Sequence, residues 1–570
     1  MRWKNIRKNK EIAVFILFLI IGLAIYANSF GNQFFWDDND EIVNNVYVQH
    51  FDVGKMFSQS MISGAGQTTN YYRPILLLSY ALDYQLWGMN SFGFNLADVL
   101  LHILNAWLIF ILLYFLLSLR PTTPQPLFRK EGSQLSPHPS FGRRGVWLAF
   151  LPALIFLIHP LNTEAVDYVS GRADVLYAFF LLLSLIFWLR QSLTRRTLPF
   201  DRRSQIINYS AAAAFFILSL LTKETAVVLP FLVLLIELIF ISAKSPGQET
   251  LPGLKKLKTV LKKTWLLFAI LAVYLILHFT VFNFNQINGS LIGCLGAYCD
   301  YNIFQRGLVF LLVCLNYFKI LFLPLGLHME RAVAEFGSIY SWKILAAAAA
   351  ILLWAAAAVF FWKKEKGIAF GFFWFFILLA PTSGIAVKMI YPTYEHFLYL
   401  PMIGFWLAVF CLIDILFAKI KPAGVLRLVK FFFYVMLTAC VVYWSILTIR
   451  HNRLWHDPLT FYENNLKYSP QSFIEHANLG MAYDDVARYQ DAIAEYQKAI
   501  AIADLYPQVH FDLANSLVAV KNYTEAEKEY LRAISMDPGF ISPYRNLYSL
   551  YVYLGEKDKA EEINKISNNK

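Results

Sequence analysis

The stretch WLLFAILAVYLILHFTVFNF, from Trp265 to Phe284, contains no acidic or basic side chain other than His278. A helix needs about 20 apolar residues to cross a bilayer. Two further runs, Ile12–Phe30 and Phe431–Ile449, are equally apolar, and we interpret the first as an uncleaved span. Backbone polar groups in lipid must bond within their own segment, so such runs form helices. The sequence therefore predicts an all-α, polytopic transmembrane bundle.

The composition argues against a soluble chain. Of 570 residues, 58% are hydrophobic and only 16% charged, against about 25% charged in soluble domains. The net charge of +11 comes from basic clusters between apolar runs, such as RQSLTRRTLPFDRR (190–203) and KIKPAGVLRLVK (419–430). Such clusters mark cytoplasmic loops. No basic-aromatic pattern of a nucleic-acid surface accompanies them, so we expect no nucleic-acid partner.

We expect a membrane domain over residues 1–450 with about 11 spans. The apolar run 307–323 spoils the alternation of basic loops if it crosses, so we interpret it as a re-entrant or surface-lying segment. An odd number of crossings then places the C-terminal domain outside the cytoplasm. The expected spans lie at 11–30, 93–118, 146–158, 174–190, 207–222, 225–242, 265–283, 341–362, 367–380, 397–418 and 429–449.

The segment 451–570 contains an internal repeat of 34 residues. This is the period of tetratricopeptide repeats, in which small residues lie where paired helices touch. We predict about three repeats and a stacked-helix surface that holds a peptide or protein partner. The pairs of equivalent residues are Tyr489 and Tyr523, Ala492 and Ala526, Tyr496 and Tyr530, and Ala499 and Ala533.

Polar residues cluster in the loops expected outside the cytoplasm. The first loop reads FFWDDNDE, with Asp37 and Asp38, and is followed by YYRP with Arg73. An aromatic belt followed by solvated charge would explain the first motif equally well. Cations on this side are unexpected by the positive-inside rule and suit a phosphate group. The other polar residues of these loops are His159, Glu164, Arg172, Asp174, Lys223, Glu224, Arg331, Glu395 and His396.

The expected span 93–118 carries a polar stripe made of Asn95, Asp98, His102 and Asn105. Steps of three and four residues place these side chains on one helix face. Taken singly, each is best interpreted as a polar contact between helices. His102 has only Asp98 nearby as a second metal ligand, so a metal site is weakly supported.

The order of these motifs resembles the transmembrane and tetratricopeptide repeat-containing (TMTC) protein O-mannosyltransferases of the glycosyltransferase C superfamily. The similarity rests on Asp37–Asp38, YYRPILLLSYALDYQLWG, FNLADVLLHILNA, HPLNTEAVDYVSGRADVL, LTKE, YEHFLYLP and RHNRLWHDPLTFYENNL leading into the repeats. It covers nearly the whole chain. Asp98 departs from the asparagine expected there, and the repeat array is short.

The resemblance implies a polyprenyl-phosphate-linked sugar donor, with mannose expected, and a protein Ser/Thr acceptor. Asp37 or Asp38 would be the general base; Arg73, Arg172, Lys223 and Arg331 would bind the lipid phosphate. A metal is not required, although the acidic cluster could hold a divalent ion. The chain would lie in a bacterial inner membrane, with the first loop and the repeats extracytoplasmic. The substrate pocket would contain His102, His159, Glu164, Asp174, Glu224, Glu395 and His396.

Three other functions remain open from the sequence. The enzyme could transfer another sugar, or use a lipid or glycan acceptor, because pocket geometry decides such choices. A non-catalytic scaffold could recruit partners through the repeats. A transporter is disfavoured, because no matched pair of broken spans recurs in two halves of the chain.

Overall fold

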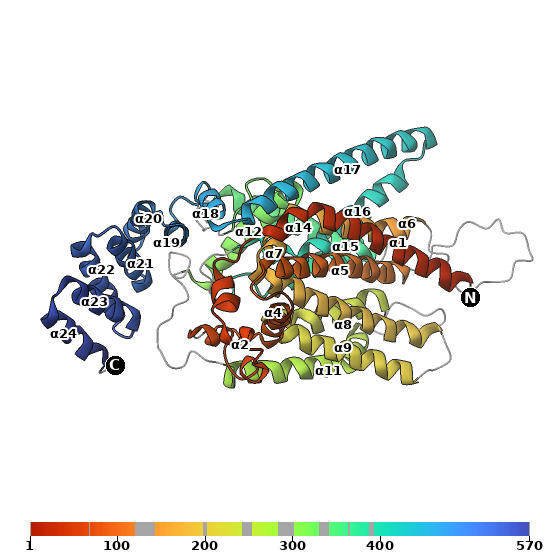
Figure 1. Ribbon diagram of the computed structural model, residues 1–570. Coiled ribbons are helices and arrows are strands. Elements are labelled where there is room, and N and C mark those ends of the chain that lie inside the picture. Colours follow the sequence, from red (N-terminus) through yellow and green to blue (C-terminus); the bar gives the residue numbers. More distant parts are fainter. Residues whose placement is uncertain are drawn as a thin grey trace, which may run out of the picture. The chain divides into compact units, whose positions relative to one another are not determined.

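The computed structural model describes residues 2–67, 69–119, 143–197, 202–241, 253–282, 301–329, 341–362, 365–386 and 393–568. These residues form two compact units, Met1–Arg453 and Leu454–Lys570. Every regular element of the described residues is helical, as predicted (Figure 1). The all-α fold class is confirmed.

The first unit is a bundle of long helices. Each predicted span falls on one of them, except that 225–242 falls on η6 (Glu224–Val228), the short α10 and η7 (Glu237–Ile241) in succession. Helix α5 packs against both α1 and α8 (Figure 1). The long helices are α1 (Arg2–Ile25), α5 (Ser91–Ser118), α6 (Arg143–Ile158), α8 (Arg172–Thr197), α9 (Arg202–Leu220), α10 (Leu229–Ile236), α11 (Gly253–Thr280), α12 (Ile303–Phe322), α14 (Trp342–Phe360), α15 (Lys366–Leu379), α16 (Pro401–Lys419) and α17 (Ala423–Asn452).

The bundle has the dimensions and composition of an integral membrane protein. Among the described residues, 9 helices are long and apolar enough to cross a membrane, or up to 10 if α6 and α7 (Thr163–Asp167), bent by 57°, form one broken span. Helices α14 and α17 expose large apolar side chains such as Leu353 and Phe431. Lipid is the solvent that such faces require.

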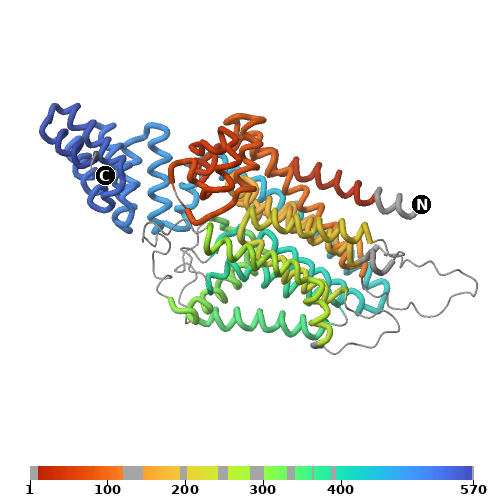
Figure 2. The backbone as a smooth tube through the Cα atoms, turned by 90° about the horizontal axis from the view of Figure 1, so that it is seen from below, coloured from red at the N-terminus to blue at the C-terminus, as the bar shows by residue number. Residues whose placement is uncertain are grey.

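Helices α1, α6 and α17 finish at the same end of the bundle, which we call the site end. The Asn28 side chain donates to the Ile449 carbonyl at 2.9 Å, and the Thr448 hydroxyl donates to the Ile158 carbonyl at 2.7 Å. The loop after α1 also gathers here, at the end of the bundle away from the N-terminus (Figure 2). The basic residues at the end of α8 and the start of α9, and those between the end of α16 and the first turns of α17, lie at the opposite end (Figure 1).

Helix α12 is long enough to cross, but its contacts place it along the site end. Arg306 in its first turn donates to the Gly384 carbonyl at 3.4 Å, in the connection between α15 and α16. Tyr317 donates to the carbonyl of Tyr394 in the same connection at 3.1 Å, and the carbonyl of Leu321 lies 3.1 Å from the His159 ring at the end of α6. The interpretation of 307–323 as a re-entrant or surface-lying segment stays a prediction.

The loop after α1 forms a small folded layer with its own core. It contains short helices α2 (Val46–Gln49) and α3 (Val53–Met56) and the longer α4 (Pro74–Trp87). Apolar residues of this layer, including Ile42 and Tyr80, are buried together with Val169 from the segment before α8. The layer therefore holds the acidic motif of the first loop against a distant part of the chain.

The second unit contains three helix pairs after the short α18 (Pro458–Leu466). The pairs are α19 (Phe473–Asp485) with α20 (Tyr489–Ile502), α21 (Pro507–Ala519) with α22 (Tyr523–Met536), and α23 (Ile541–Leu554) with α24 (Lys557–Asn568). The predicted 34-residue repeat is confirmed. Ala492 and Ala526 are fully buried at equivalent positions, and a Cβ added to Gly480 would lie 2.6 Å from the Tyr496 ring.

Candidate active site

The Asp38 side chain is buried and hydrogen-bonded within the protein, so it is not accessible to a substrate. Its side chain is 0% exposed and accepts hydrogen bonds from the Ser170 backbone N–H at 2.8 Å, the Ser170 hydroxyl at 2.5 Å and the Phe35 N–H at 3.3 Å. Burial raises the pKa of Asp38 to about 7, against the opposing effect of these hydrogen bonds; the charge of Asp37 adds to the rise. The carboxylate has the contacts of a structural anchor.

Asp37 lies beside this anchor and is an exposed residue. Its backbone N–H donates to the Tyr168 hydroxyl at 3.1 Å. The packed protein around the carboxylate disfavours its charge and raises the pKa of Asp37 to about 6, and repulsion by Asp40 adds to this rise. A separate hydrogen bond between the Tyr168 side chain and the carboxylate opposes the rise, as does the charge of Arg73. A carboxylate with a pKa near neutrality, on a residue that is accessible from outside, has the properties of a general base.

Two ion pairs bring the sequence-predicted cations to the same region. Arg73 forms a two-point pair with Glu224, at 3.1 Å from Nε and 2.6 Å from Nη2. Lys223 binds both oxygens of Asp174, at 2.8 and 2.7 Å. Lys223 and Glu224 are neighbours in the turn that precedes α10, so the two pairs are adjacent, and both lie near the α4 and α8 starts.

A histidine continues this array. The His396 Nδ1 lies 2.6 Å from Glu164, whose other oxygen accepts the His396 backbone N–H at 2.8 Å. The His396 Nε2 lies 4.0 Å from Asp174. The array thus joins the first loop, the α6–α8 segment, the α9–α10 turn and the α15–α16 connection. Glu395 points elsewhere, because it accepts the backbone N–H of His328 at 2.9 Å.

Three other predicted site residues lie inside the bundle. Arg172 is 1% exposed and paired with two carboxylates, Asp98 at 2.6 Å and Asp83 at 2.5 Å, so its guanidinium is inaccessible to a substrate as well as compensated. His102 and His159 are 0% exposed, and both ring nitrogens of each lie within hydrogen-bond distance of protein partners. These placements correspond to structural roles, and we retain none of the three as a substrate contact. Arg331 lies outside the described residues.

The polar stripe of α5 also joins helices, as expected for its single members. Asn95 donates to the Asn32 carbonyl at 3.1 Å and Asn105 to the Val175 carbonyl at 2.8 Å. Asp98 is the partner of Arg172, which gives a physical reason for an acid at this position. Among the described residues, no group of three His, Cys, Asp or Glu side chains could hold a metal ion.

Sequence reasoning missed Tyr168 and Ser170. Both lie in the motif HPLNTEAVDYVSGRAD. The candidate residues of this motif were chosen for charged or titratable side chains, and an uncharged tyrosine or serine gave no such signal. Their roles depend on contacts with residues 131 and 132 positions earlier in the chain.

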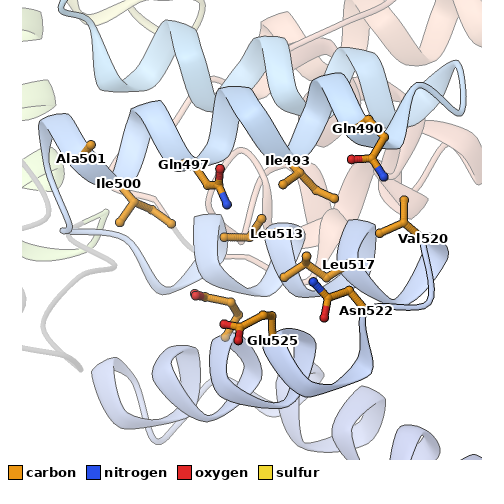
Figure 3. Close-up of a pocket in the computed structure, with 11 residues that line it drawn as sticks. Gln490, Ile493, Gln497, Ile500, Ala501, Leu513, Leu517, Val520, Asn522 and Glu525 are labelled. Carbon is orange, nitrogen blue, oxygen red and sulfur yellow. The ribbon is translucent and has the colours of Figure 1, made fainter.

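The repeat unit contains a separate open pocket of about 470 Å³ (Figure 3). Its floor is apolar, with Leu513 and Leu517 from α21, and its sides come from α20 and α22. Gln490 and Gln497 line one side, and Glu525 lies on the other. Such a surface suits a polypeptide better than a sugar.

Comparison with known proteins finds two kinds of relative. A Tetratricopeptide repeat family model matches residues 476–504 and 507–540. The "Protein O-mannosyl-transferase F38B6.6" of Caenorhabditis elegans is 24% identical over 510 residues, which cover 88% of this chain and 64% of that protein. Protein O-mannosyl-transferase TMTC1 of Mus musculus is 31% identical over 35% of this chain and 19% of its own. TMTC4 of Homo sapiens is 30% identical over 29% and 21%.

These matches confirm the resemblance to the TMTC proteins. The chain spans less than two thirds of the length of these curated relatives. Among solved structures, the crystal structure of MamA is 23% identical, with a TM-score of 0.19, over 22% of this chain and 71% of that chain.

Proposed function

We propose that this chain is a membrane glycosyltransferase that moves a hexose, with mannose expected, from a polyprenyl-phosphate carrier to a protein Ser or Thr hydroxyl. The observation that carries the proposal is the exposed residue Asp37, whose carboxylate is close enough to Arg73 for that charge to lower its pKa. The ion pair of Arg73 adjoins that of Lys223 at the same end of the membrane bundle. The named relatives support the mannosyl class. No cofactor is required by this chemistry.

In the proposed reaction, Asp37 takes the proton of the acceptor hydroxyl as its oxygen attacks the anomeric carbon. The bond from that carbon to the phosphate oxygen breaks, and the lipid phosphate leaves with the electron pair. A hydroxyl is a poor nucleophile at neutral pH, so a placed base is required. Arg73 and Lys223 would stabilise the charge that develops on the phosphate.

The pairing of both cations fits a site that waits for an anionic ligand. Glu224 and Asp174 compensate Arg73 and Lys223 without substrate, which avoids an uncompensated charge at the half-buried Arg73 and the buried Lys223. A guanidinium has five N–H donors, so Arg73 can bind a phosphate while it keeps part of the pair with Glu224. Glu164, Asp174, Glu224 and His396 are the proposed pocket residues.

The proposed orientation puts the site end outside the cytoplasm. Basic segments belong to the opposite end, and short basic loops stay on the cytoplasmic side. We further propose a bacterial inner membrane as the location. The repeat unit would then bind protein acceptors, for which the pocket between α20 and α22 offers a surface.

The test is transfer from radiolabelled polyprenyl-phosphate-mannose to envelope proteins by the purified full chain. Asp37→Asn should reduce transfer by at least about 100-fold, since a general base contributes roughly 10²–10⁴-fold. Asp52→Asn is the matched control, because Asp52 lies in the same loop and only caps α3. Label in lipid or glycan but not protein would favour the other acceptors. No transfer by folded wild type from several donor sugars would overturn the proposal and favour the scaffold.

A further inference from the structure

Tyr168 connects the first loop with the segment that leads into α8. It lies between α7 and η5 (Val169–Gly171) and is 5% exposed. Its hydroxyl accepts the backbone N–H of Asp37 at 3.1 Å. Its ring stacks on Trp36, with ring centroids 5.6 Å apart and planes 20° from parallel. Tyr168 therefore contacts the proposed base and the residue before it.

The backbone at Trp36 explains why such support is needed. Its φ angle is +55°, in the left-handed region that bulky residues rarely adopt. Strained conformations persist only where the surrounding structure holds them, and they cluster at functional sites. The turn at Trp36 presents Asp37 to solvent while Asp38 points inward to Ser170. The stack on Tyr168 is a contact that maintains this turn.

We propose that Tyr168 is a positioning residue that holds Asp37 in the geometry of a base, and that the Tyr168–Ser170 segment makes the two adjacent aspartates different. This inference rests on the proposed function for its catalytic meaning. Its structural content is independent of the reaction: the hydroxyl of Tyr168 binds at Asp37, and Ser170 binds Asp38.

The ring and the hydroxyl group of Tyr168 make separate contacts. A phenylalanine would fill the same space and keep the stack on Trp36, but it would lose the hydroxyl that accepts from Asp37. A second interaction, between the Tyr168 side chain and the Asp37 carboxylate, favours the charged form of that carboxylate. Removing the hydroxyl should therefore leave the fold intact and alter the position and the titration of one carboxylate.

The first experiment compares Tyr168→Phe with Tyr72→Phe. Tyr72 is a matched control, because it is also buried and its hydroxyl donates to the Phe57 carbonyl at 3.0 Å in the same layer. We expect Tyr168→Phe to lower kcat by about tenfold, with little change in the KM of the donor. The acid limb of its pH profile should move to higher pH. Trp36→Leu, which removes the stack but keeps the hydroxyl, should also lower kcat.

The second experiment needs no sugar transfer. Labelling of Asp37 by a water-soluble carbodiimide, followed by peptide mass spectrometry, gives the pH midpoint of its carboxyl group. Tyr168→Phe should raise this midpoint and Tyr72→Phe should leave it unchanged. A midpoint and a kcat equal to wild type in Tyr168→Phe would overturn the inference. An inactive wild type with a raised midpoint in Tyr168→Phe would instead overturn the proposed function and keep the contact.

Discussion

Arg73 and Glu224 form a two-point ion pair across 151 residues of sequence, with Nη2 2.6 Å from Oε1. The pair joins the first loop to the turn before α10, and it lies directly beside the pair of Lys223 with Asp174. If Arg73 also binds the donor phosphate, substitutions of Arg73 and of Glu224 should change the KM of the donor in different ways.

Arg73→Lys should raise the KM of the lipid-phosphate donor by about tenfold, because an ammonium cannot reproduce the planar fork of a guanidinium. Glu224→Gln should lower this KM or leave it unchanged, since it removes the anion that competes with phosphate. Steady-state kinetics with varied donor measure both. Equal increases of KM in the two variants would indicate that the pair only holds the loop.

The activity should depend on pH through Asp37. A general base works only when deprotonated, and the pKa of Asp37 is raised to about 6. Transfer should therefore fall as pH drops below about 6 and reach a plateau above about 7. The profile of kcat/KM between pH 4.5 and 8 checks this sign. A rate that rises toward low pH would contradict the assignment of Asp37 as base.

Asp38→Asn should lower stability as well as activity. The asparagine carbonyl can still accept from Ser170, but its NH₂ group then faces the Phe35 N–H, and two donors cannot pair. A buried donor left without a partner costs about 1–3 kcal/mol. Thermal unfolding in detergent measures the loss. Asp37→Asn serves as the comparison, because substitution of this exposed residue should leave the unfolding temperature nearly unchanged.

Gly480→Ala should weaken the first repeat. The new Cβ would lie 2.6 Å from the Tyr496 ring between α19 and α20. Overpacking of this kind costs about 1–3 kcal/mol. Limited proteolysis of the full chain should cut the repeats sooner, and transfer to folded protein acceptors should fall more than transfer to a short Ser/Thr peptide. Equal losses on both acceptors would argue against acceptor binding by the repeats.

The repeat unit should lose stability as pH rises through the raised pKa of His510. Burial acts to lower the pKa of His510, but its hydrogen bonds with Glu529 at 2.5 Å and Asp504 at 2.8 Å outweigh burial and raise it. When the pKa of a histidine is higher in the folded than in the unfolded state, its protonation stabilises the folded state. This contribution is complete below the unfolded pKa, about 6.5. It disappears as pH rises past the pKa of the folded state.

Protease resistance of α21 and α22 at pH 6 and pH 9 measures this effect in the full chain. His510→Gln should be less resistant than wild type at pH 6 and should differ little from it at pH 9. A difference between the two chains that persists unchanged at pH 9 would show that shape, and not charge, is responsible.

The sequence by itself determined the elements and the residues worth testing. Apolar runs of sufficient length have one solution in lipid, the helix, so the spans followed from composition. The 34-residue period likewise predicted the repeats, because small residues must recur where helix pairs touch. The positions of Arg73, Lys223 and Glu224 in loops also indicated a polar site outside the apolar runs.

Only the tertiary structure decided which of these residues contact one another and which are already paired with a buried partner. Asp37 and Asp38 are identical and adjacent in sequence, and they differ because Tyr168 and Ser170 arrive from more than 130 residues away. Arg172 was predicted to bind phosphate, but Asp98 and Asp83 compensate its charge inside the bundle. The free energy of a charged or polar side chain depends on the groups that surround it after folding, and long-range packing sets those groups.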